Sequence, residues 1–230
     1  MTKVKICGIT NKEDAFWASS LGADFIGLNF VKNSIRKVSL NNAKEIVSSI
    51  PQYSSVVCVF VNEDIKNIVK ICKKLNVSYV QLHGEETPDY CNQLKLECSF
   101  LKIIKVFKIK PEQDLQQQEI NDYVLDLYNK IKSYLNYVDY LLFDTYIENE
   151  MGGTGKTFSW SVVKQIKGMM NEDGNYINFF IAGGLTPENV DEVVKFLEPW
   201  GIDVASGVER LPRRKDFEKM KSFIRKVKSV

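Results

Sequence analysis

Short apolar segments recur along the whole chain, and each is followed by a turn and then by an amphipathic segment. They lie at residues 4–7, 25–30, 55–61, 79–82, 100–107, 140–144, 177–182 and 202–205. Several are almost continuously hydrophobic, such as VVCVFV in the third and NFFIA in the seventh. This pattern is typical of strands that are buried on both faces of a parallel sheet.

The segments between these strands carry helix signals. Thr87 and Thr186 each precede a proline, which places a capping hydroxyl before Pro at the first helical position. Apolar residues recur at helical spacing in the segments 44–50, 65–75, 160–166, 190–197 and 217–227. This alternation predicts an α/β fold, a (β/α)8 TIM barrel that residues 1–230 form as a single domain. An open doubly wound sheet is the alternative, because the same alternation would suit it.

Two connections are longer than the others, residues 108–139 and 169–176. The first contains the polar stretch PEQDLQQQE and then a helical pattern up to Tyr137, and the second contains the turn-forming stretch NEDGN. We expect both to lie on the helix side of the barrel, remote from the active face. Neither has the composition of a domain linker.

The composition is that of an ordinary globular protein, with 44% hydrophobic and 26% charged residues. The formal charge of +2 implies no broad attraction to nucleic acid or to a membrane. Basic residues in 210–228 are interspersed with acidic ones at helical spacing, which predicts a solvated helix face. The chain has neither an apolar leader segment nor a run of about 18 apolar residues. We therefore expect a cytoplasmic protein with no nucleic-acid or membrane partner.

The five cysteines, Cys7, Cys58, Cys72, Cys91 and Cys98, form no C-x-x-C pair and have no histidine cluster beside them. This spacing argues against a zinc site and against a disulfide framework. An odd number of scattered thiols suits a reducing compartment. We interpret all of them except Cys7 as small buried hydrophobic residues.

Barrel enzymes place their sites at the carboxyl ends of the strands. The polar or glycine residues that end the apolar segments are Cys7, Asn29, Asn62, His83, Asp144, Gly183, Gly184, Ser206 and Gly207, and Asp203 lies inside the last segment. Glycine loops before helix starts offer free backbone N–H groups. We therefore expect a phosphate site at Gly183, Gly184, Ser206 and Gly207, because barrel phosphate sites commonly follow the last two strands.

Asp144 ends the apolar run Tyr-Leu-Leu-Phe, at the mouth of a core of low dielectric constant. Burial raises the pKa of a carboxyl group, which suits a general acid; the alternative is a residue that caps the following turn. Cys7 ends the first strand directly before Gly8, where it is either catalytic or only packed. Arg36 could bind a carboxylate with two parallel hydrogen bonds, or lie on the surface. His83, the only histidine, suits a polar substrate contact or a structural role.

The glycine-rich stretch MGGTGKT at 151–157 superficially resembles a P-loop. The P-loop pattern would require glycine at position 150, where this chain has Glu150. We therefore exclude nucleotide hydrolysis and interpret the stretch as a lid that closes over a substrate.

Taken together, these segments resemble one enzyme family over residues 3–216. The motifs are KICGIT at 5–10, Ser34-x-Arg36-x-Val38, QLHG at 81–84, Asp144 followed by GGTGKTF at 152–158, AGGL at 182–185 and DVASGVE at 203–209. They stand in the order found in the phosphoribosylanthranilate isomerases of tryptophan biosynthesis, which the chain strongly resembles.

The resemblance implies a (β/α)8 barrel that converts N-(5-phosphoribosyl)anthranilate into 1-(2-carboxyphenylamino)-1-deoxyribulose 5-phosphate, an aldose–ketose isomerisation without metal or organic cofactor. It implies that Asp144 is the general acid that opens the ribose ring and that Cys7 is the general base at C2′. It also implies that Arg36 holds the anthranilate carboxylate and that Asp203 contacts the ribose hydroxyls. A thiol with a pKa of about 8.5 needs only a modest downward shift to act as a thiolate base near neutral pH. The partner is then a small phosphorylated substrate, and the protein is a monomer or a homodimer.

The chain departs from the usual pattern of this family at several positions. Ile35 stands where proline is common, Ala205 where serine is common, Ser159 where aspartate is frequent, and Arg213 where glycine is usual. None of these changes removes a proposed catalytic group. They leave open the shape of the loop that carries Arg36 and of the turn before the last helix.

Two alternative functions remain. One is another phosphate-binding barrel, such as indole-glycerol-phosphate synthase, the tryptophan synthase α subunit or ribulose-phosphate epimerase. The single histidine argues against the epimerase, whereas Lys105 in the fifth strand gives some support to the synthase. The other alternative is a catalytically silent barrel that only binds a ligand or a protein, which the presence of both Cys7 and Asp144 argues against.

Overall fold

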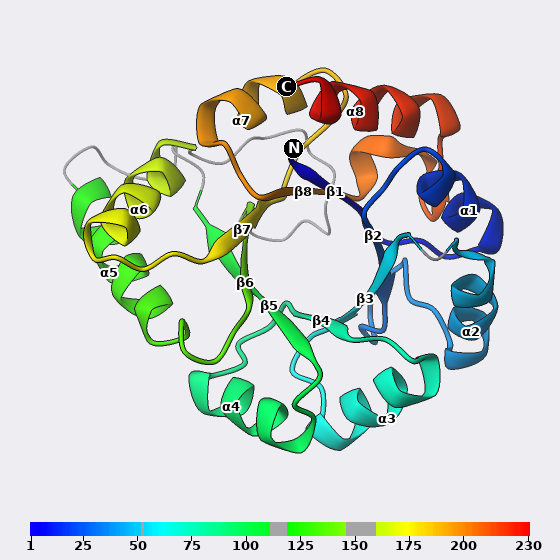
Figure 1. Cartoon of the computed structure of the whole chain (residues 1–230), viewed down its shortest axis with the longest axis horizontal. Coiled ribbons are helices and arrows are strands. Elements are labelled where there is room, and N and C mark those ends of the chain that lie inside the picture. Colours follow the sequence, from blue (N-terminus) through cyan, green and yellow to red (C-terminus); the bar gives the residue numbers. More distant parts are fainter. Residues whose placement is uncertain (52, 111–118, 146–159) are drawn as a thin grey trace.

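The computed structural model describes residues 1–51, 53–110, 119–145 and 160–230, and its central feature is a closed barrel of parallel strands in chain order (Figure 1). The strands are β1 (Lys3–Ile6), β2 (Phe25–Asn29), β3 (Ser55–Phe60), β4 (Tyr79–Leu82), β5 (Lys102–Ile109), β6 (Tyr140–Thr145), β7 (Asn178–Ile181) and β8 (Gly201–Val204). The helices are α1 (Lys12–Ser20), α2 (Leu40–Ser49), α3 (Ile65–Leu75), α4 (Pro88–Glu97), α5 (Ile120–Lys132), α6 (Trp160–Glu172), α7 (Val190–Leu197) and α8 (Phe217–Ser229). The TIM barrel predicted from the sequence is confirmed, and the open sheet is excluded.

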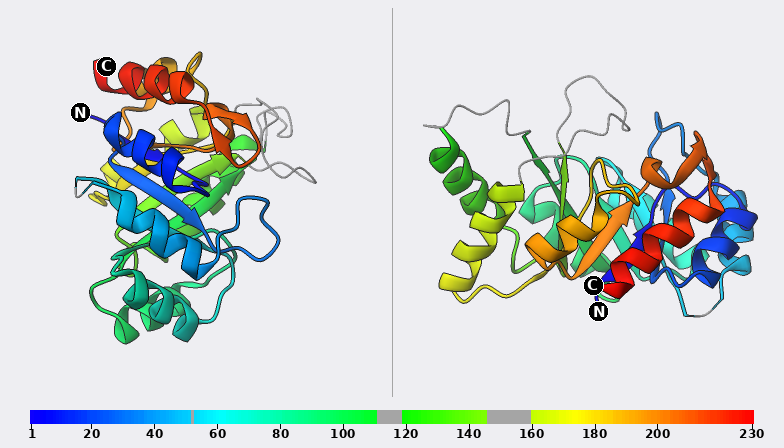
Figure 2. Two further views of the ribbon diagram at one scale, coloured as in Figure 1. Left: turned by 90° about the vertical axis from the view of Figure 1, so that its right-hand side faces the viewer. Right: turned by 90° about the horizontal axis from the view of Figure 1, so that it is seen from above.

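The barrel closes where β1 pairs with β8, with Lys5 opposite Asp203. The two chain ends lie side by side next to this seam (Figures 1 and 2). Asp24 joins them, because it accepts hydrogen bonds from Lys3 and from the Val4 N–H group in β1 and from Lys228 in α8. The seam is thus held by side chains as well as by the strand pairing.

An aromatic cluster fills the amino-terminal end of the barrel interior. Phe25 and Tyr140 begin β2 and β6, and they pack with Phe180 of β7 and with Trp200, which precedes β8. Ring centroids are 5.0 Å apart for Phe180 and Trp200 and 4.8 Å apart for Tyr140 and Trp200. Because this end is closed by apolar rings, polar side chains that point into the barrel gather toward its carboxyl end.

Helix starts follow the sequence signals at one of the two Thr-Pro positions. At α4 the Thr87 side chain accepts a hydrogen bond from the Tyr90 N–H group, as the capping signal predicts. At α7 the prediction was wrong, because the helix begins at Val190 and not at Pro187. Asn189 holds the preceding residues in a turn, since its side chain accepts from the Thr186 N–H group at 2.9 Å and donates to the Gly184 carbonyl oxygen at 3.0 Å.

The connection 169–176 leads from α6 toward β7 on the helix side as expected, whereas the expectation was wrong for the start of 108–139, because Lys108 pairs with Asp144 at the carboxyl end of the barrel. The segment 108–139 extends β5 to Ile109 and then forms α5, which packs next to α6 (Figure 1). A feature that the sequence pattern does not predict follows β8. It consists of a short 3₁₀ helix (Ser206–Val208) and a hairpin of β9 (Glu209–Leu211) and β10 (Arg214–Lys215). Figure 2 shows this hairpin at the end of the barrel opposite to the N-terminus.

Candidate active site

The carboxyl end of the barrel brings together the side chains that the sequence singles out. Cys7 follows β1, His83 follows β4, Asp144 lies in β6 and Asp203 lies in β8. His83 Nε2 and Asp144 Oδ2 are 3.3 Å apart. Both of these groups influence the pKa of Asp203 from across the barrel. The four residues therefore belong to one electrostatic cluster.

Cys7 lies beside a buried ion pair that the sequence analysis did not identify. The ammonium group of Lys5 is 2.9 Å from each carboxylate oxygen of Asp203, and the Lys5 side chain is fully buried. Burial raises the pKa of the Cys7 thiol, and the charge of Lys5 opposes this effect without cancelling it. The pKa of the thiol is therefore shifted upward and not in the downward direction that a thiolate base needs, because desolvation outweighs the nearby cations. A lysine between the apolar residues Val4 and Ile6, two residues before Cys7, was the available signal for this pair.

Asp144 is only partly buried, with 24% of its side chain exposed. The desolvation expected from the sequence thus acts on this carboxyl group only in part. The ring of His83 is oriented by Gln81, whose Nε2 lies 3.0 Å from His83 Nδ1. Because an amide N–H group can only donate, this contact makes Nδ1 the acceptor and leaves the proton on Nε2, which faces Asp144.

Arg36 is held by a residue from near the other end of the chain. Its Nε and Nη2 atoms donate to Glu209 Oε1 and Oε2 at 2.8 and 2.7 Å. Burial alone would raise the pKa of Glu209, but the hydrogen bond from Arg36 and the charge of Lys215 keep it below its ordinary value. A guanidinium group has five N–H donors, so the edge formed by Nη1 and Nη2 keeps donors for a further carboxylate.

The loop around Arg36 is shaped by residues that the sequence motifs contain. The Asn29 side chain donates to Ser34 Oγ, and Ser34 Oγ accepts from the Arg36 N–H group at 3.1 Å. Gly8 has a φ of +71°, and a Cβ atom there would lie 2.4 Å from Arg36 Cδ. The side chain of Arg36 therefore requires glycine directly after Cys7, which places the guanidinium stem next to the thiol-bearing residue.

Lys215 in β10 is a second buried cation that the sequence analysis missed. Its ammonium group donates to the Ala205 carbonyl oxygen at 2.8 Å and to Glu209 Oε1 at 3.2 Å. Burial lowers the pKa of Lys215, and Glu209 partly restores it. The hairpin thus places Lys215 next to Glu209, which contacts Arg36 in the loop after β2.

The two predicted phosphate loops lie against each other. Gly183 and Gly184 follow β7 with φ values of +88° and +62°, which favour glycine. A Cβ atom on Gly207 would lie 1.8 Å from the Leu185 carbonyl oxygen, so the 3₁₀ helix that contains Ser206 packs directly on the other loop. The backbone of both loops is therefore available at one place above β7 and β8.

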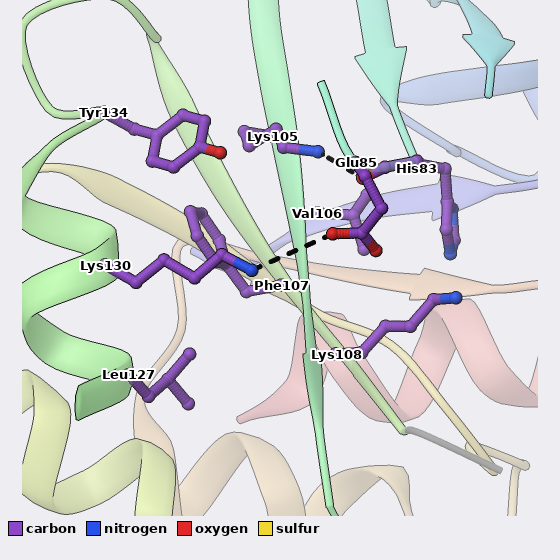
Figure 3. A pocket seen from close by; sticks show the side chains of 10 residues that line it. His83, Glu85, Lys105, Val106, Phe107, Lys108, Leu127, Lys130 and Tyr134 are labelled. Atoms are coloured by element: carbon purple, nitrogen blue, oxygen red, sulfur yellow. Dashed lines mark hydrogen bonds and ion pairs between the residues drawn. The ribbon is translucent and has the colours of Figure 1, made fainter. Parts of the chain in front are cut away.

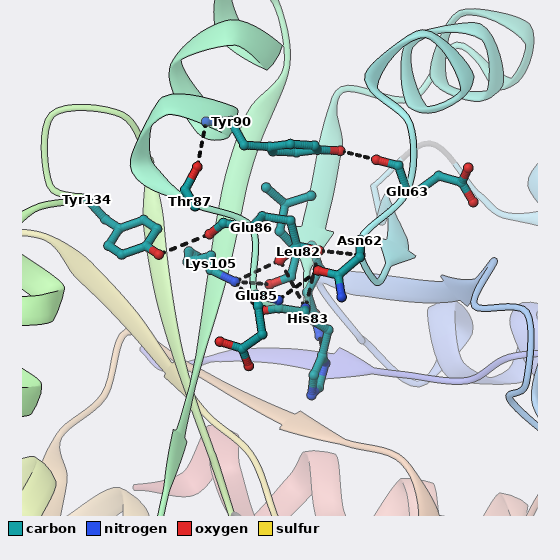
Figure 4. Close-up of polar contacts among 12 residues, drawn as sticks. Asn62, Glu63, Leu82, His83, Glu85, Glu86, Thr87, Tyr90, Lys105 and Tyr134 are labelled. Carbon is teal, nitrogen blue, oxygen red and sulfur yellow. Dashed lines mark hydrogen bonds and ion pairs between the residues drawn. The ribbon is translucent and has the colours of Figure 1, made fainter.

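A separate buried network accounts for Lys105 (Figure 4). Its ammonium group lies 2.8 Å from Glu86 Oε2, 2.7 Å from the Gly84 carbonyl oxygen and 3.4 Å from the Leu82 carbonyl oxygen. Glu86 also accepts a hydrogen bond from the Asn62 N–H group. The three N–H bonds of Lys105 thus have acceptors, which removes the support that this residue gave to the synthase alternative.

Figure 3 shows a small cavity between His83, the β5 residues Lys105–Lys108 and the helix α5. Its volume is about 80 Å³. A ligand pocket typically encloses about 300–1,000 Å³, so this cavity is too small for a phosphorylated sugar that carries an aromatic ring. It is large enough for a few water molecules.

The predicted glycine-rich lid at 151–157 and Ser159 lie outside the described residues. Within the described parts of the chain, no three histidine, cysteine or carboxylate side chains gather closely enough to hold a metal ion. Among the same residues, no helix combines the length and the apolarity that a membrane span requires.

Comparisons with known proteins agree with this geometry. The profile of the family described as N-(5'phosphoribosyl)anthranilate (PRA) isomerase matches residues 4–226. The N-(5'-phosphoribosyl)anthranilate isomerase of Thermoanaerobacter pseudethanolicus is 38% identical over 233 aligned positions, which cover 100% of both chains. The crystal structure of phosphoribosyl anthranilate isomerase from Thermotoga maritima superposes with a TM-score of 0.81 at 33% identity and covers 100% of both chains.

A further crystal structure is that of a phosphoribosyl anthranilate isomerase in complex with reduced 1-(o-carboxyphenylamino)-1-deoxyribulose 5-phosphate. It superposes with a TM-score of 0.76 at 31% identity and also covers 100% of both chains. The profile match, the relatives and the barrel lead to one conclusion: this chain belongs to the N-(5'-phosphoribosyl)anthranilate isomerase family.

Proposed function

We propose that this chain isomerises N-(5'-phosphoribosyl)anthranilate to its ketose, with Cys7 as general base and Asp144 as general acid. The observation that carries the proposal is the contact between Arg36 and Gly8, which places a carboxylate-binding group directly beside Cys7. A substrate whose carboxylate is held by the available edge of Arg36 has its reacting carbons within the barrel mouth. The thiol lies on one side of that mouth and Asp144 with His83 on the other.

The first step opens the ribose ring. Asp144 in its acid form gives a proton to the ring oxygen, and the bond between C1′ and that oxygen breaks. The lone pair of the anthranilate nitrogen forms the C1′=N bond, which gives a positively charged Schiff base. The partly exposed carboxyl group can recover its proton from solvent, and the His83 N–H group next to it stabilises the carboxylate that is left.

The second step moves a proton from carbon. The Cys7 thiolate removes the C2′ proton, and the electron pair forms the C1′=C2′ bond while the nitrogen becomes neutral. The resulting enolamine gains a proton at C1′ and loses one from the C2′ hydroxyl, which gives the ketose. Every step is a proton transfer, so the balance of the reaction requires no oxidant, reductant or metal.

Other predicted residues bind the remaining parts of the substrate. Asp203 accepts hydrogen bonds from ribose hydroxyls at the rim of the barrel. The backbone N–H groups of the loops at Gly183–Gly184 and Ser206–Gly207 bind the phosphate, because oriented N–H groups attract anions. The predicted state of monomer or homodimer stays a prediction.

The test is the decay of anthranilate fluorescence when the purified protein is added to substrate that is generated in situ. We expect a decay faster than the spontaneous background with the wild type. The control variant Cys98→Ala, which lacks the thiol at the end of α4, should behave in the same way. We expect almost no enhancement with folded Cys7→Ala. Full activity of Cys7→Ala would remove this residue from its role, and an inactive, folded wild type would favour the silent barrel.

A further inference from the structure

Lys5 is a charged residue in the interior of the barrel, and its side chain is fully buried. Its ammonium group bonds both carboxylate oxygens of Asp203 at 2.9 Å. Burying an ion pair is costly, and apolar residues of similar volume would often fill such a place without that cost. Packing alone therefore does not explain why a lysine stands here.

Lys5 and Cys7 point to the same side of their strand, because side chains alternate along an extended backbone. Gly27 on the neighbouring β2 faces both of them. A Cβ atom built on Gly27 would lie 2.8 Å from Cys7 Sγ and 3.1 Å from Lys5 Nζ. Glycine at this position thus leaves the space in which the ammonium group and the thiol approach each other.

Four charged groups face Cys7. Lys5, Lys215 and Arg36 are cations on β1, on β10 and in the loop after β2, and Asp203 on β8 is an anion. Burial raises the pKa of the thiol, Lys5 gives the largest effect in the opposite direction, and Asp203 adds to the effect of burial. Lys215 also lowers this pKa, by less than Lys5 does.

We propose that Lys5 is a positioning residue that stabilises the thiolate of Cys7, with Asp203 holding its ammonium group in place. The proposal rests on the role of Cys7 as the base under the proposed function. This role accounts for the buried cation, because a lysine at position 5 brings its ammonium group to the same side of the strand as the thiol. It also gives Asp203 a second task, since the carboxylate that faces the substrate anchors the cation that faces the base.

The test measures the rate at which iodoacetamide alkylates Cys7 as a function of pH, with the site identified by mass spectrometry. The midpoint of this profile reports the thiol pKa, because only the thiolate reacts. In Lys5→Met we expect the midpoint to rise by at least about one pH unit, which is a tenfold loss of thiolate below the midpoint. The pH at which kcat/KM reaches half of its maximum should rise in parallel.

The matched control is Lys3→Met, which removes a lysine from the same strand that pairs with Asp24 and not with Cys7. Its midpoint should equal that of the wild type. A folded Lys5→Met with an unchanged midpoint would overturn the proposal, because a purely structural lysine has no effect on the titration of the thiol.

Gly27→Ala tests the same contact with both charges retained, and it applies even where Lys5→Met does not fold. Its added methyl group would lie 2.8 Å from Cys7 Sγ, 3.0 Å from Cys7 Cα and 3.1 Å from Lys5 Nζ, so the thiol and the ammonium group must move apart, and in the folded protein we expect a raised midpoint. An unchanged midpoint would contradict the proposal. Alkylation requires no turnover, so a shifted midpoint in an inactive protein would refute the proposed function only. If the wild type is active and the alkylation midpoints of Lys5→Met and Gly27→Ala equal that of the wild type, only the role of Lys5 is refuted.

Discussion

Arg36 and Glu209 are joined by two parallel hydrogen bonds, from Nε to Oε1 at 2.8 Å and from Nη2 to Oε2 at 2.7 Å. The pair links the loop after β2 with the hairpin that follows β8. Parallel hydrogen bonds fix the plane of the guanidinium group as well as its position. The orientation of the remaining N–H edge of Arg36 is therefore set by Glu209.

Glu209→Gln should weaken substrate binding more than chemistry. An amide cannot accept both hydrogen bonds, and the loss of one to a charged group is worth roughly 1.5–3 kcal/mol. We expect KM to rise by at least about tenfold while kcat changes much less. Steady-state kinetics beside Glu13→Gln, which breaks an exposed pair with Arg214, provide the check. An unchanged KM in folded Glu209→Gln would show that Arg36 is positioned without this carboxylate.

Arg213 combines a backbone cost with a contact to the Arg36 loop. Its φ is +73°, the left-handed region that favours the glycine usual in this family. Its Nη1 atom donates to the Ile35 carbonyl oxygen at 2.8 Å, so two of the departures from the family pattern touch each other. The contact explains how the loop that carries Arg36 is held in place although it lacks the usual proline.

Two substitutions at Arg213 separate the cost from the contact. The free energy of unfolding of Arg213→Gly should be about 1 kcal/mol higher than that of Arg213→Ala, because only glycine adopts this φ freely. Both variants lose the bond to Ile35 and should show the same modest rise in KM. Urea unfolding and steady-state kinetics measure the two effects. Equal stabilities would mean that the backbone at this position is not strained, and an unchanged KM would mean that the contact does not hold the loop.

The repeating elements of the fold could be predicted from the sequence because their apolar patterns are continuous. The predicted bounds of β4, α3 and α7 are those observed, although Thr186 was wrongly expected to cap α7. The β9–β10 hairpin was not foreseen, since its short strands carry charged residues and no alternating apolar pattern.

The site was predictable where a residue ends a strand, and it was not where a residue depends on a distant partner. Cys7, Asp144 and His83 end apolar runs, so their position at the barrel mouth follows from the chain order. Glu209 and Lys215 are buried because the Glu209 carboxylate pairs with both Lys215 and Arg36 across the fold. Sequence spacing carries no information on such a pairing.

His83 should act through Asp144. The Gln81 amide leaves the proton on His83 Nε2, which lies 3.3 Å from Asp144 Oδ2, so loss of the ring removes this polar contact with the carboxylate. We expect His83→Ala to lower kcat by about tenfold, a loss of roughly 1.4 kcal/mol, and Asp144→Asn to lower it by about 10²–10⁴.

The double variant distinguishes this arrangement from two independent contributions. Residues that act as a unit give non-additive losses. The His83→Ala/Asp144→Asn protein should therefore lose no more than Asp144→Asn alone when kcat is compared. A loss equal to the product of the two single effects would assign His83 its own contact with the substrate.

Asp24 should contribute to acid sensitivity. Burial opposes ionisation of this carboxyl group, but hydrogen bonds from Lys228, Val4 and Lys3 hold its pKa below the ordinary value of 3.8. Because the folded pKa lies below the unfolded one, the stabilisation is complete above about pH 4–5 and is lost as the pH falls through the folded pKa. Asp24→Asn should therefore unfold more easily than the wild type at pH 7, and this difference should shrink as the pH approaches 3. Urea unfolding at both pH values, with the exposed Asp126→Asn as control, gives the measurement. A difference that stays constant with pH would show that the carboxylate does not join the two ends of the chain by its charge.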